Sequence, residues 1–152
     1  ELGRGSVFRV RLPVAPSGRA ASAPPPPQAA LRRGRLLIVD DEPLLARTLQ
    51  LLLAPQHDVT VLHDARDALE HLRNGTAYDA ILCDVMMAEM TGEQFYEELA
   101  RTAPEQTFRI IFMTGGAFTQ TARDFLARVP NGRLQKPFQQ HELDKLLAVL
   151  LQ

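Results

Sequence analysis

The sequence lacks the marks of several protein classes. It contains a single cysteine, Cys83, so no disulfide can form within the chain, and a reducing compartment such as the cytoplasm is indicated. No apolar run approaches the roughly 18 residues that a membrane-spanning helix needs. The N-terminal residues also lack the basic and then apolar pattern of a secretory signal. We therefore expect a cytoplasmic protein that makes no membrane contact through this chain.

The charge is almost balanced but is unevenly distributed. The net charge is −1. Residues 1–34 carry one acid against six arginines, which gives +5, and residues 35–152 carry 17 acids against 11 lysines and arginines, which gives −6. A mildly acidic main part argues against nucleic-acid binding. The arginines of the first part are spaced out and interrupted by prolines, which is typical of a solvated tail.

Composition divides the chain into three parts. Residues 14–34 are rich in proline and alanine and include a run of four prolines, and such a segment buries too little apolar surface to fold. We interpret it as an interdomain linker. Ahead of it, residues 1–13 alternate apolar and polar side chains from Val7 to Leu12, the pattern of a half-buried strand. One strand alone has nothing to pair with, so residues 1–13 are interpreted as the remnant of a preceding domain and residues 35–152 as a domain of their own.

From residue 35 onward, apolar runs alternate with amphipathic segments. The expected strands lie at about 35–39, 58–62, 79–83, 108–113 and 133–135. The expected helices lie at about 43–54, 65–73 and 93–102, with a fourth striped from Phe118 to Val129 and a fifth striped from Leu143 to Leu151. Five strand–helix units with short connections predict an α/β fold, a (βα)5 doubly wound parallel sheet with helices on both faces.

Polar side chains follow four of the expected strands. They are Asp40 and Asp41 after the first, Asp84 after the third, Thr114 after the fourth and Lys136 after the fifth. In open α/β sheets, ligands bind at the edge formed by the carboxyl ends of the strands. Acids, a hydroxyl and an amine gathered there suit a divalent cation and a phosphoryl group. Lysine is otherwise scarce, with two lysines beside fifteen arginines, so we interpret a lysine at a strand end as a candidate functional residue.

Each of these residues also has a simpler interpretation. Asp40 and Asp41 could cap the helix that follows them, because acids favour a helix N-terminus, and Asp84 could be a capping acid as well. Thr114, ahead of two glycines, could belong to a turn, and Lys136 could mark an ordinary strand-to-loop junction. Polar residues at the ends of four strands, taken together, favour a joint site over separate structural roles.

Four motifs resemble the response-regulator receiver domain of two-component signalling. They are Leu36–Pro43, Asp84–Gly92, Met113–Gly115 and Lys136–Phe138, in family order and at family spacing. The resemblance implies a flavodoxin-like fold with strand order 2-1-3-4-5. It also implies that Asp84 takes a phosphoryl group from a phosphohistidine, forming an aspartyl-phosphate that is slowly hydrolysed. The partner would be a histidine-kinase dimerisation and phosphoacceptor domain or a histidine phosphotransfer protein.

The resemblance also implies the cofactor and the role of each site residue. The cofactor would be Mg²⁺, which takes oxygen ligands in near-octahedral geometry. Its implied ligands are the carboxylates of Asp41 and Asp84, the Asp40 carboxylate mainly through water, and the Met86 backbone carbonyl. Lys136 would pair with one phosphoryl oxygen, and the Thr114 hydroxyl would hydrogen-bond another.

Two positions depart from the family pattern. Ala88 stands where receivers usually have proline, which should loosen the loop after Asp84 without removing its chemistry. Arg133 stands where they usually have an aromatic residue, which swings inward as the threonine turns toward the phosphoryl group. An arginine cannot pack inward in that way without a partner for its charge. We therefore expect phosphorylation to be intact while the output surface, formed by the fourth helix, fifth strand and fifth helix, responds differently.

A second, shorter resemblance concerns the N-terminal residues. Gly3–Pro13 is similar to the last segment of histidine-kinase ATP-binding domains. Followed by a linker and a receiver, it indicates a piece of a hybrid sensor histidine kinase. The residues that bind ATP or carry the phosphohistidine would lie upstream, so this piece should have no kinase activity of its own.

Two other functions are alternatives to phosphoryl acceptance. A docking module with a vestigial acidic site would need no phosphorylation, and Arg133 is its best support. A small aspartyl-phosphate hydrolase of the dehalogenase type is disfavoured, because no Asp-x-Asp-x-Thr motif ends a strand.

Three histidines and the cysteine belong to none of these motifs. His57, His63 and His71 have no metal-ligand spacing and are expected at the surface. Cys83 precedes an acid on a buried strand and is expected in the core rather than as a reactive thiol.

Overall fold

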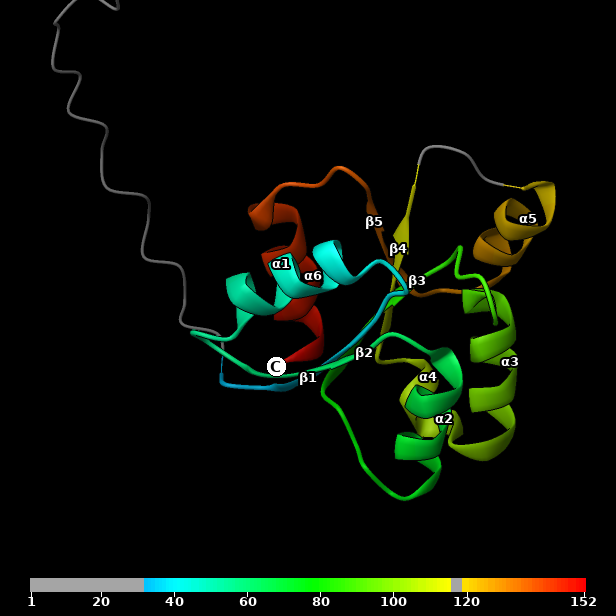
Figure 1. Cartoon of the computed structure of the whole chain (residues 1–152), viewed down its shortest axis with the longest axis horizontal. Coiled ribbons are helices and arrows are strands. Elements are labelled where there is room, and N and C mark those ends of the chain that lie inside the picture. The colour runs from blue at the N-terminus through cyan, green and yellow to red at the C-terminus, as the bar shows by residue number, and fades with distance from the viewer. Residues whose placement is uncertain (1–31, 116–118) are drawn as a thin grey trace, which may run out of the picture.

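The computed structural model describes residues 32–115 and 119–152. Their strands form a five-stranded parallel sheet in the order β2-β1-β3-β4-β5 (Figure 1). The strands are β1 (Arg35–Val39), β2 (Asp58–Leu62), β3 (Ala80–Asp84), β4 (Ile110–Thr114) and β5 (Gly132–Gln135). The predicted fold class and strand order are therefore confirmed. The predictions for residues 1–13 and for most of the linker at 14–34 lie outside the described residues.

Six helices lie among the described residues and cover both faces of the sheet. They are α1 (Pro43–Leu53), α2 (Ala65–Arg73), α3 (Gly92–Thr102), α4 (Pro104–Thr107), α5 (Gln120–Arg128) and α6 (Gln140–Leu150). Helices α1 and α6 pack on one face, and α2, α3 and α5 pack on the other (Figure 1). In this described part of the chain, no helix is long and apolar enough to cross a membrane.

The central strands are apolar on both sides because helices cover both faces of the sheet. Strands β3 and β4 are buried along their whole length, and β1 is buried after its first residue. Alternate side chains enter separate cores: Leu36 and Ile38 pack with α1 and α6, whereas Leu37 and Val39 pack with the helices of the opposite face. A shift by one residue would exchange the two sets, so burial on both faces fixes the register.

This register brings the carboxyl ends of four strands to one edge of the sheet. Val39 of β1 pairs with Cys83 of β3, and Thr114 of β4 pairs with Gln135 of β5. The residues that follow Val39 and Cys83 are therefore neighbours, and the residue that follows Gln135 emerges at the same edge. The polar strand ends identified in the sequence thus converge on one side of the molecule.

Helix α4 is not predicted by the sequence, which places the start of a strand at residue 108. Pro104 opens this short helix, and the Thr107 hydroxyl donates to the Pro104 carbonyl at 2.6 Å. Strand β4 begins accordingly at Ile110. A four-residue helix is too short to show the periodicity that identifies helices. The fourth and fifth helices expected from the sequence are therefore α5 and α6, and Phe118 lies outside the described residues.

Candidate functional site

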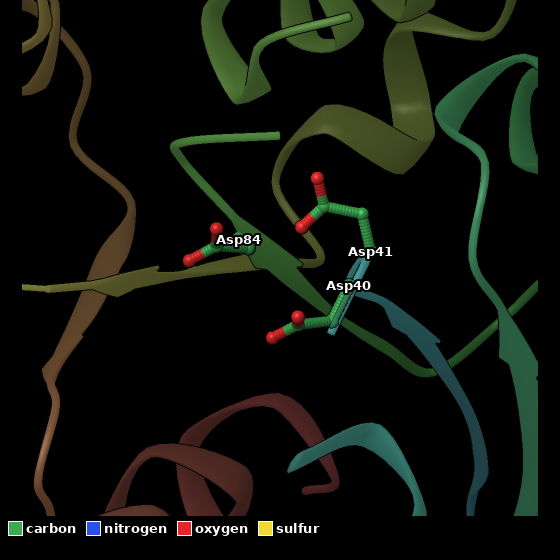
Figure 2. Close-up of side chains that lie close together, drawn as sticks. All are labelled: Asp40, Asp41 and Asp84. Carbon is green, nitrogen blue, oxygen red and sulfur yellow. The ribbon is translucent and has the colours of Figure 1, made fainter. Parts of the chain in front are cut away.

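Three acids from two strands meet at the carboxyl edge of the sheet. Asp40 and Asp41 follow β1 directly, and Asp84 is the last residue of β3. One carboxylate oxygen of each lies within 4.8 Å of the others (Figure 2). Asp40 and Asp84 are buried, with 0% and 7% of their surface exposed. Asp41 is exposed, so the cluster has a buried floor and a side that faces solvent.

Lys136 joins the two buried acids. It follows β5, and its Nζ donates hydrogen bonds to Asp40 Oδ2 and Asp84 Oδ1, both at 2.9 Å. Its backbone amide donates to the Thr114 carbonyl at 2.7 Å, which holds the residue after β5 against the end of β4. The structure therefore places this amine beside both acids, although 96 residues separate it from Asp40.

Burial and neighbouring charges shift two pKa values at this cluster. Burial raises the pKa of Asp84, and the hydrogen bond from Lys136 opposes that shift without cancelling it. Burial disfavours the charged amine of Lys136, but the hydrogen bonds to Asp84 and Asp40 outweigh this effect and raise its pKa. Lys136 is therefore firmly protonated, whereas Asp84 carries its negative charge at a cost. A carboxylate in that condition gains from a second cation nearby.

Backbone amides of different elements hold the two acids after β1. The Glu42 amide donates to Asp40 Oδ1 at 2.9 Å, and the Ala88 amide donates to Asp41 Oδ2 at 2.8 Å. The N-cap residue of α1 is Glu42, which follows both acids and makes no side-chain capping bond, so the capping interpretation does not account for Asp40 and Asp41. Ala88 matters here because a proline has no amide hydrogen to donate. The alanine that was expected to loosen this loop therefore supplies a contact between the loop and Asp41.

Asp84 is likewise explained by the cluster and not by helix capping. The cap of α3 is Thr91, which forms a capping box with Gln94. Asp84 Oδ2 accepts the backbone amide of Met86 at 3.2 Å. Gly92, the first residue of α3, lies so close that an added Cβ would stand 2.8 Å from the Asp84 backbone oxygen. The helix thus starts directly behind the acid, and Met86 lies in the loop between them.

Thr114 is the last residue of β4, and its side chain is buried. Its hydroxyl donates to the Leu134 carbonyl of β5 at 3.3 Å. The turn interpretation therefore does not describe this residue. The role expected from the sequence, a hydrogen bond to a phosphoryl oxygen, requires the hydroxyl to leave the Leu134 carbonyl.

Arg133 has the partners that its charge requires. Its guanidinium donates to the backbone carbonyls of Leu126 and Val129, the latter at 3.4 Å. Leu126 lies in the last turn of α5, and Val129 is its C-cap residue. The C-terminus of a helix carries partial negative charge, so a cation there is favourable. Arg133 therefore connects β5 to the end of α5.

Two histidines make contacts that sequence reasoning missed. His57 is buried, with 3% of its surface exposed, so its expected surface position is wrong. Its Nδ1 accepts the Gly34 amide at 3.3 Å, and burial, followed by the charge of Arg33, lowers its pKa. His63 is exposed as expected, but its Nδ1 lies 2.9 Å from the Asp40 carbonyl oxygen. Each contact spans 23 residues, so no local pattern could reveal it.

The fold and this constellation match one known family. Residues 36–148 match the response regulator receiver domain. The chain belongs to this family. Receiver domains act in the phosphorelays of two-component systems, with histidine kinases or phosphotransfer proteins as their partners.

Several curated proteins are similar to this receiver domain. Sensor kinase CckA of Brucella abortus is 29% identical over 165 residues, which cover 100% of this chain and 17% of CckA. Sensor protein TorS of Escherichia coli is 31% identical over 149 residues, which cover 97% of this chain and 16% of TorS. Response regulator Rre1 of Synechocystis is 29% identical over 114 residues, which cover 74% of this chain and 49% of Rre1. The chain thus spans about half or less of the length of these relatives.

A solved structure supports the same assignment. The receiver domain of sensor histidine kinase PA1611 from Pseudomonas aeruginosa superposes with a TM-score of 0.69 at 25% identity, and the match covers 78% of this chain and 98% of that one. That structure holds a magnesium ion coordinated in its active-site cleft.

Proposed function

We propose that this receiver domain accepts a phosphoryl group on Asp84 from a phosphohistidine in a reaction that requires Mg²⁺. The observation that carries the proposal is the meeting of Asp40, Asp41 and Asp84 within 4.8 Å. Lys136 lies 2.9 Å from two of them, at the carboxyl edge of a parallel sheet. A nucleophile, a cation site and a fixed amine are the parts that phosphoryl transfer to a carboxylate needs.

The chemistry of these donors fits magnesium. Carboxylate oxygens are hard ligands, and Mg²⁺ is bound through one or two carboxylates while it keeps several waters. Asp41 and Asp84 would hold the ion directly, Asp40 through water, and the Met86 carbonyl would add an oxygen. When bound, the ion neutralises negative charge on the phosphoryl oxygens. The PA1611 receiver domain, which holds magnesium in its cleft, supports this assignment.

The protein residues have separate tasks in the transfer. An Asp84 carboxylate oxygen attacks phosphorus, the phosphorus–nitrogen bond of the phosphohistidine breaks, and the bonding electrons leave with the imidazole. Lys136 is already within reach of the nucleophile, and its ammonium would pair with an oxygen of the transferred group. The Thr114 hydroxyl would exchange the Leu134 carbonyl for another phosphoryl oxygen. Positioning and charge neutralisation account for most of the rate in such transfers.

The partner and the output follow from this assignment. The donor would be a histidine-kinase phosphoacceptor domain or a histidine phosphotransfer protein, and the aspartyl-phosphate would be hydrolysed slowly. The surface of α5, β5 and α6 would change its interactions on phosphorylation. Arg133 ties β5 to the end of α5, so we expect this surface to respond less freely than one with an aromatic residue there.

The parent protein would be a hybrid sensor histidine kinase, and this chain would be a piece of its cytoplasmic portion. The matches to the sensor kinases CckA and TorS support this origin, because they extend over nearly the whole chain and include residues ahead of the receiver domain. Residues 1–13 would then be the end of the kinase ATP-binding domain, residues 14–34 the linker and residues 35–152 the receiver. The chain itself would have no kinase activity.

Incubation with a small phosphodonor and Mg²⁺, followed by intact-mass measurement, tests the proposal. We expect one phosphoryl adduct on the wild type, its absence in Asp84→Asn, and an unchanged adduct in Asp67→Asn. Asp67 is a matched control because it is an exposed aspartate in the first turn of α2. An adduct that survives Asp84→Asn would overturn the assignment of the nucleophile. No adduct on the wild type would favour a docking module, and rapid multiple turnover would favour a hydrolase.

A further inference from the structure

The carbonyl of Asp40 lies where the ladder between β1 and β2 ends. The Asp40 amide donates the last ladder bond, to the Leu62 carbonyl at 3.2 Å. Beyond this point the chain of β2 turns away into α2, whose N-cap is Asp64. The donor that reaches the Asp40 carbonyl is instead a side chain, the His63 ring, at 2.9 Å. Because a carbonyl oxygen accepts and cannot donate, Nδ1 of His63 carries the hydrogen in this contact.

This hydrogen bond acts on both neighbouring acids through the planarity of the peptide group. The Asp40 carbonyl and the Asp41 amide and Cα share one rigid plane. Fixing the carbonyl therefore fixes the direction in which the chain enters Asp41. Asp41 is exposed, and the contact from the Ala88 amide comes from a different loop. The plane between the two acids is thus held from the β2 side by His63.

We infer that His63 is a positioning residue for the metal site: its Nδ1–H holds the Asp40–Asp41 peptide in the orientation that lets both carboxylates face Asp84. This inference rests on the proposed Mg²⁺ dependence of the site. The His63 ring bonds the Asp40 backbone carbonyl, which is not among the oxygens proposed to hold the ion. Partners that orient metal ligands typically change metal affinity by about 10–100-fold when they are removed.

Three variants separate this hydrogen bond from other effects of the ring. His63→Ala removes the donor. His63→Asn keeps one, because the Asn side-chain amide nitrogen lies as many bonds from Cβ as Nδ1 of histidine does. His141→Ala is the matched control, since His141 is an exposed histidine in the first turn of α6.

The measurement is the Mg²⁺ dissociation constant, obtained from the rise in melting temperature with Mg²⁺ concentration. Circular dichroism in EDTA establishes that each variant is folded. We expect His63→Ala to bind Mg²⁺ about tenfold more weakly than the wild type, with His63→Asn restored and His141→Ala unchanged. Equal affinity in His63→Ala and the wild type would overturn the inference while leaving the metal site intact. Weak binding in both His63 variants would assign the effect to the ring and not to its hydrogen bond, which also overturns it. A wild type that does not respond to Mg²⁺ would instead refute the proposed function.

Discussion

The charge balance at the acid cluster gives a prediction with a definite sign. Asp84→Asn replaces a buried carboxylate with an amide of nearly the same shape, whose oxygen can still accept from Lys136. Burial raises the pKa of Asp84, which means that folding disfavours the charged form of this side chain relative to the unfolded chain. We therefore expect Asp84→Asn to melt at a higher temperature than the wild type in buffer that contains EDTA.

Opposing interactions set the size of this effect. At the 4.8 Å limit, Asp84 and Asp40 repel by about 3.5 kcal/mol with an effective dielectric near 20. At 2.9 Å, Asp84 and Lys136 attract by about 6 kcal/mol on the same basis. The substitution removes both interactions, keeps a hydrogen bond from the ammonium to a neutral amide oxygen, and relieves a burial penalty of several kcal/mol. We expect a net stabilisation of about 1–2 kcal/mol, which corresponds to about 4–8 °C in melting temperature.

Thermal scans with and without Mg²⁺ test this reasoning. For the wild type, Mg²⁺ at about ten times its dissociation constant should add roughly 1.4 kcal/mol, or about 5 °C. Asp84→Asn should lose most of this response, because it lacks one of the ligands. Asp67→Asn should match the wild type in both buffers. A lower melting temperature for Asp84→Asn in EDTA, or a full Mg²⁺ response in this variant, would refute the account of the charge balance.

Three further predictions concern neighbouring contacts. Lys136→Met leaves two buried carboxylates without their amine, so urea unfolding in EDTA should show a loss of roughly 3–5 kcal/mol that Mg²⁺ partly restores; no loss would contradict the pairing. Because burial lowers the pKa of His57, the unfolded chain takes up this proton first, and stability should fall as the pH drops below about 6.5. Urea midpoints at about pH 7.5 and 5.5 should therefore differ in the wild type and differ less in His57→Gln. Ala88→Pro removes the amide bonded to Asp41, and Ala88→Ser keeps it. In thermal unfolding with EDTA, the free energy of unfolding of Ala88→Pro should therefore be about 1 kcal/mol lower than that of Ala88→Ser.

The fold could be predicted because its signals are local and strong. Strands β1, β3 and β4 are short apolar runs, and α2 and α6 carry clear apolar stripes. The convergence of the polar strand ends follows from the parallel order, since the carboxyl ends of parallel strands share one edge. Helix α4 was missed because four residues give no periodicity.

The contacts that orient the site were beyond sequence reasoning for a different reason. The bonds from His63 to the Asp40 carbonyl and from the Ala88 amide to Asp41 use backbone atoms, which every residue has. Nothing in the side-chain pattern distinguishes the carbonyl or amide that will be used. Arg133 shows the same limit: its unusual identity was visible, but its partners are the backbone carbonyls of Leu126 in α5 and of the C-cap residue Val129. Such pairings depend on how the elements pack, so they can be identified in the folded structure and not in the sequence.

Arg133 also leads to a prediction about the output surface. The Thr114 hydroxyl donates to the Leu134 carbonyl, next to the residue whose guanidinium is bonded to the end of α5. A phosphoryl group that draws this hydroxyl away would release one contact of β5 while α5 stays attached through Arg133. Removing the attachment in Arg133→Ala should cost about 0.5–1 kcal/mol of stability and leave phosphorylation of Asp84 unchanged.

The consequence for α5 can be measured by NMR with a phosphoryl mimic. Shift changes along α5 should be larger in Arg133→Ala than in the wild type, because the helix end is then free to follow β5. Thr114→Val, which removes the hydroxyl, should reduce these changes in either background. Equal α5 responses in Arg133→Ala and the wild type would mean that the two carbonyl contacts do not restrain the helix. The arginine would then stabilise α5 without influencing its response to phosphorylation.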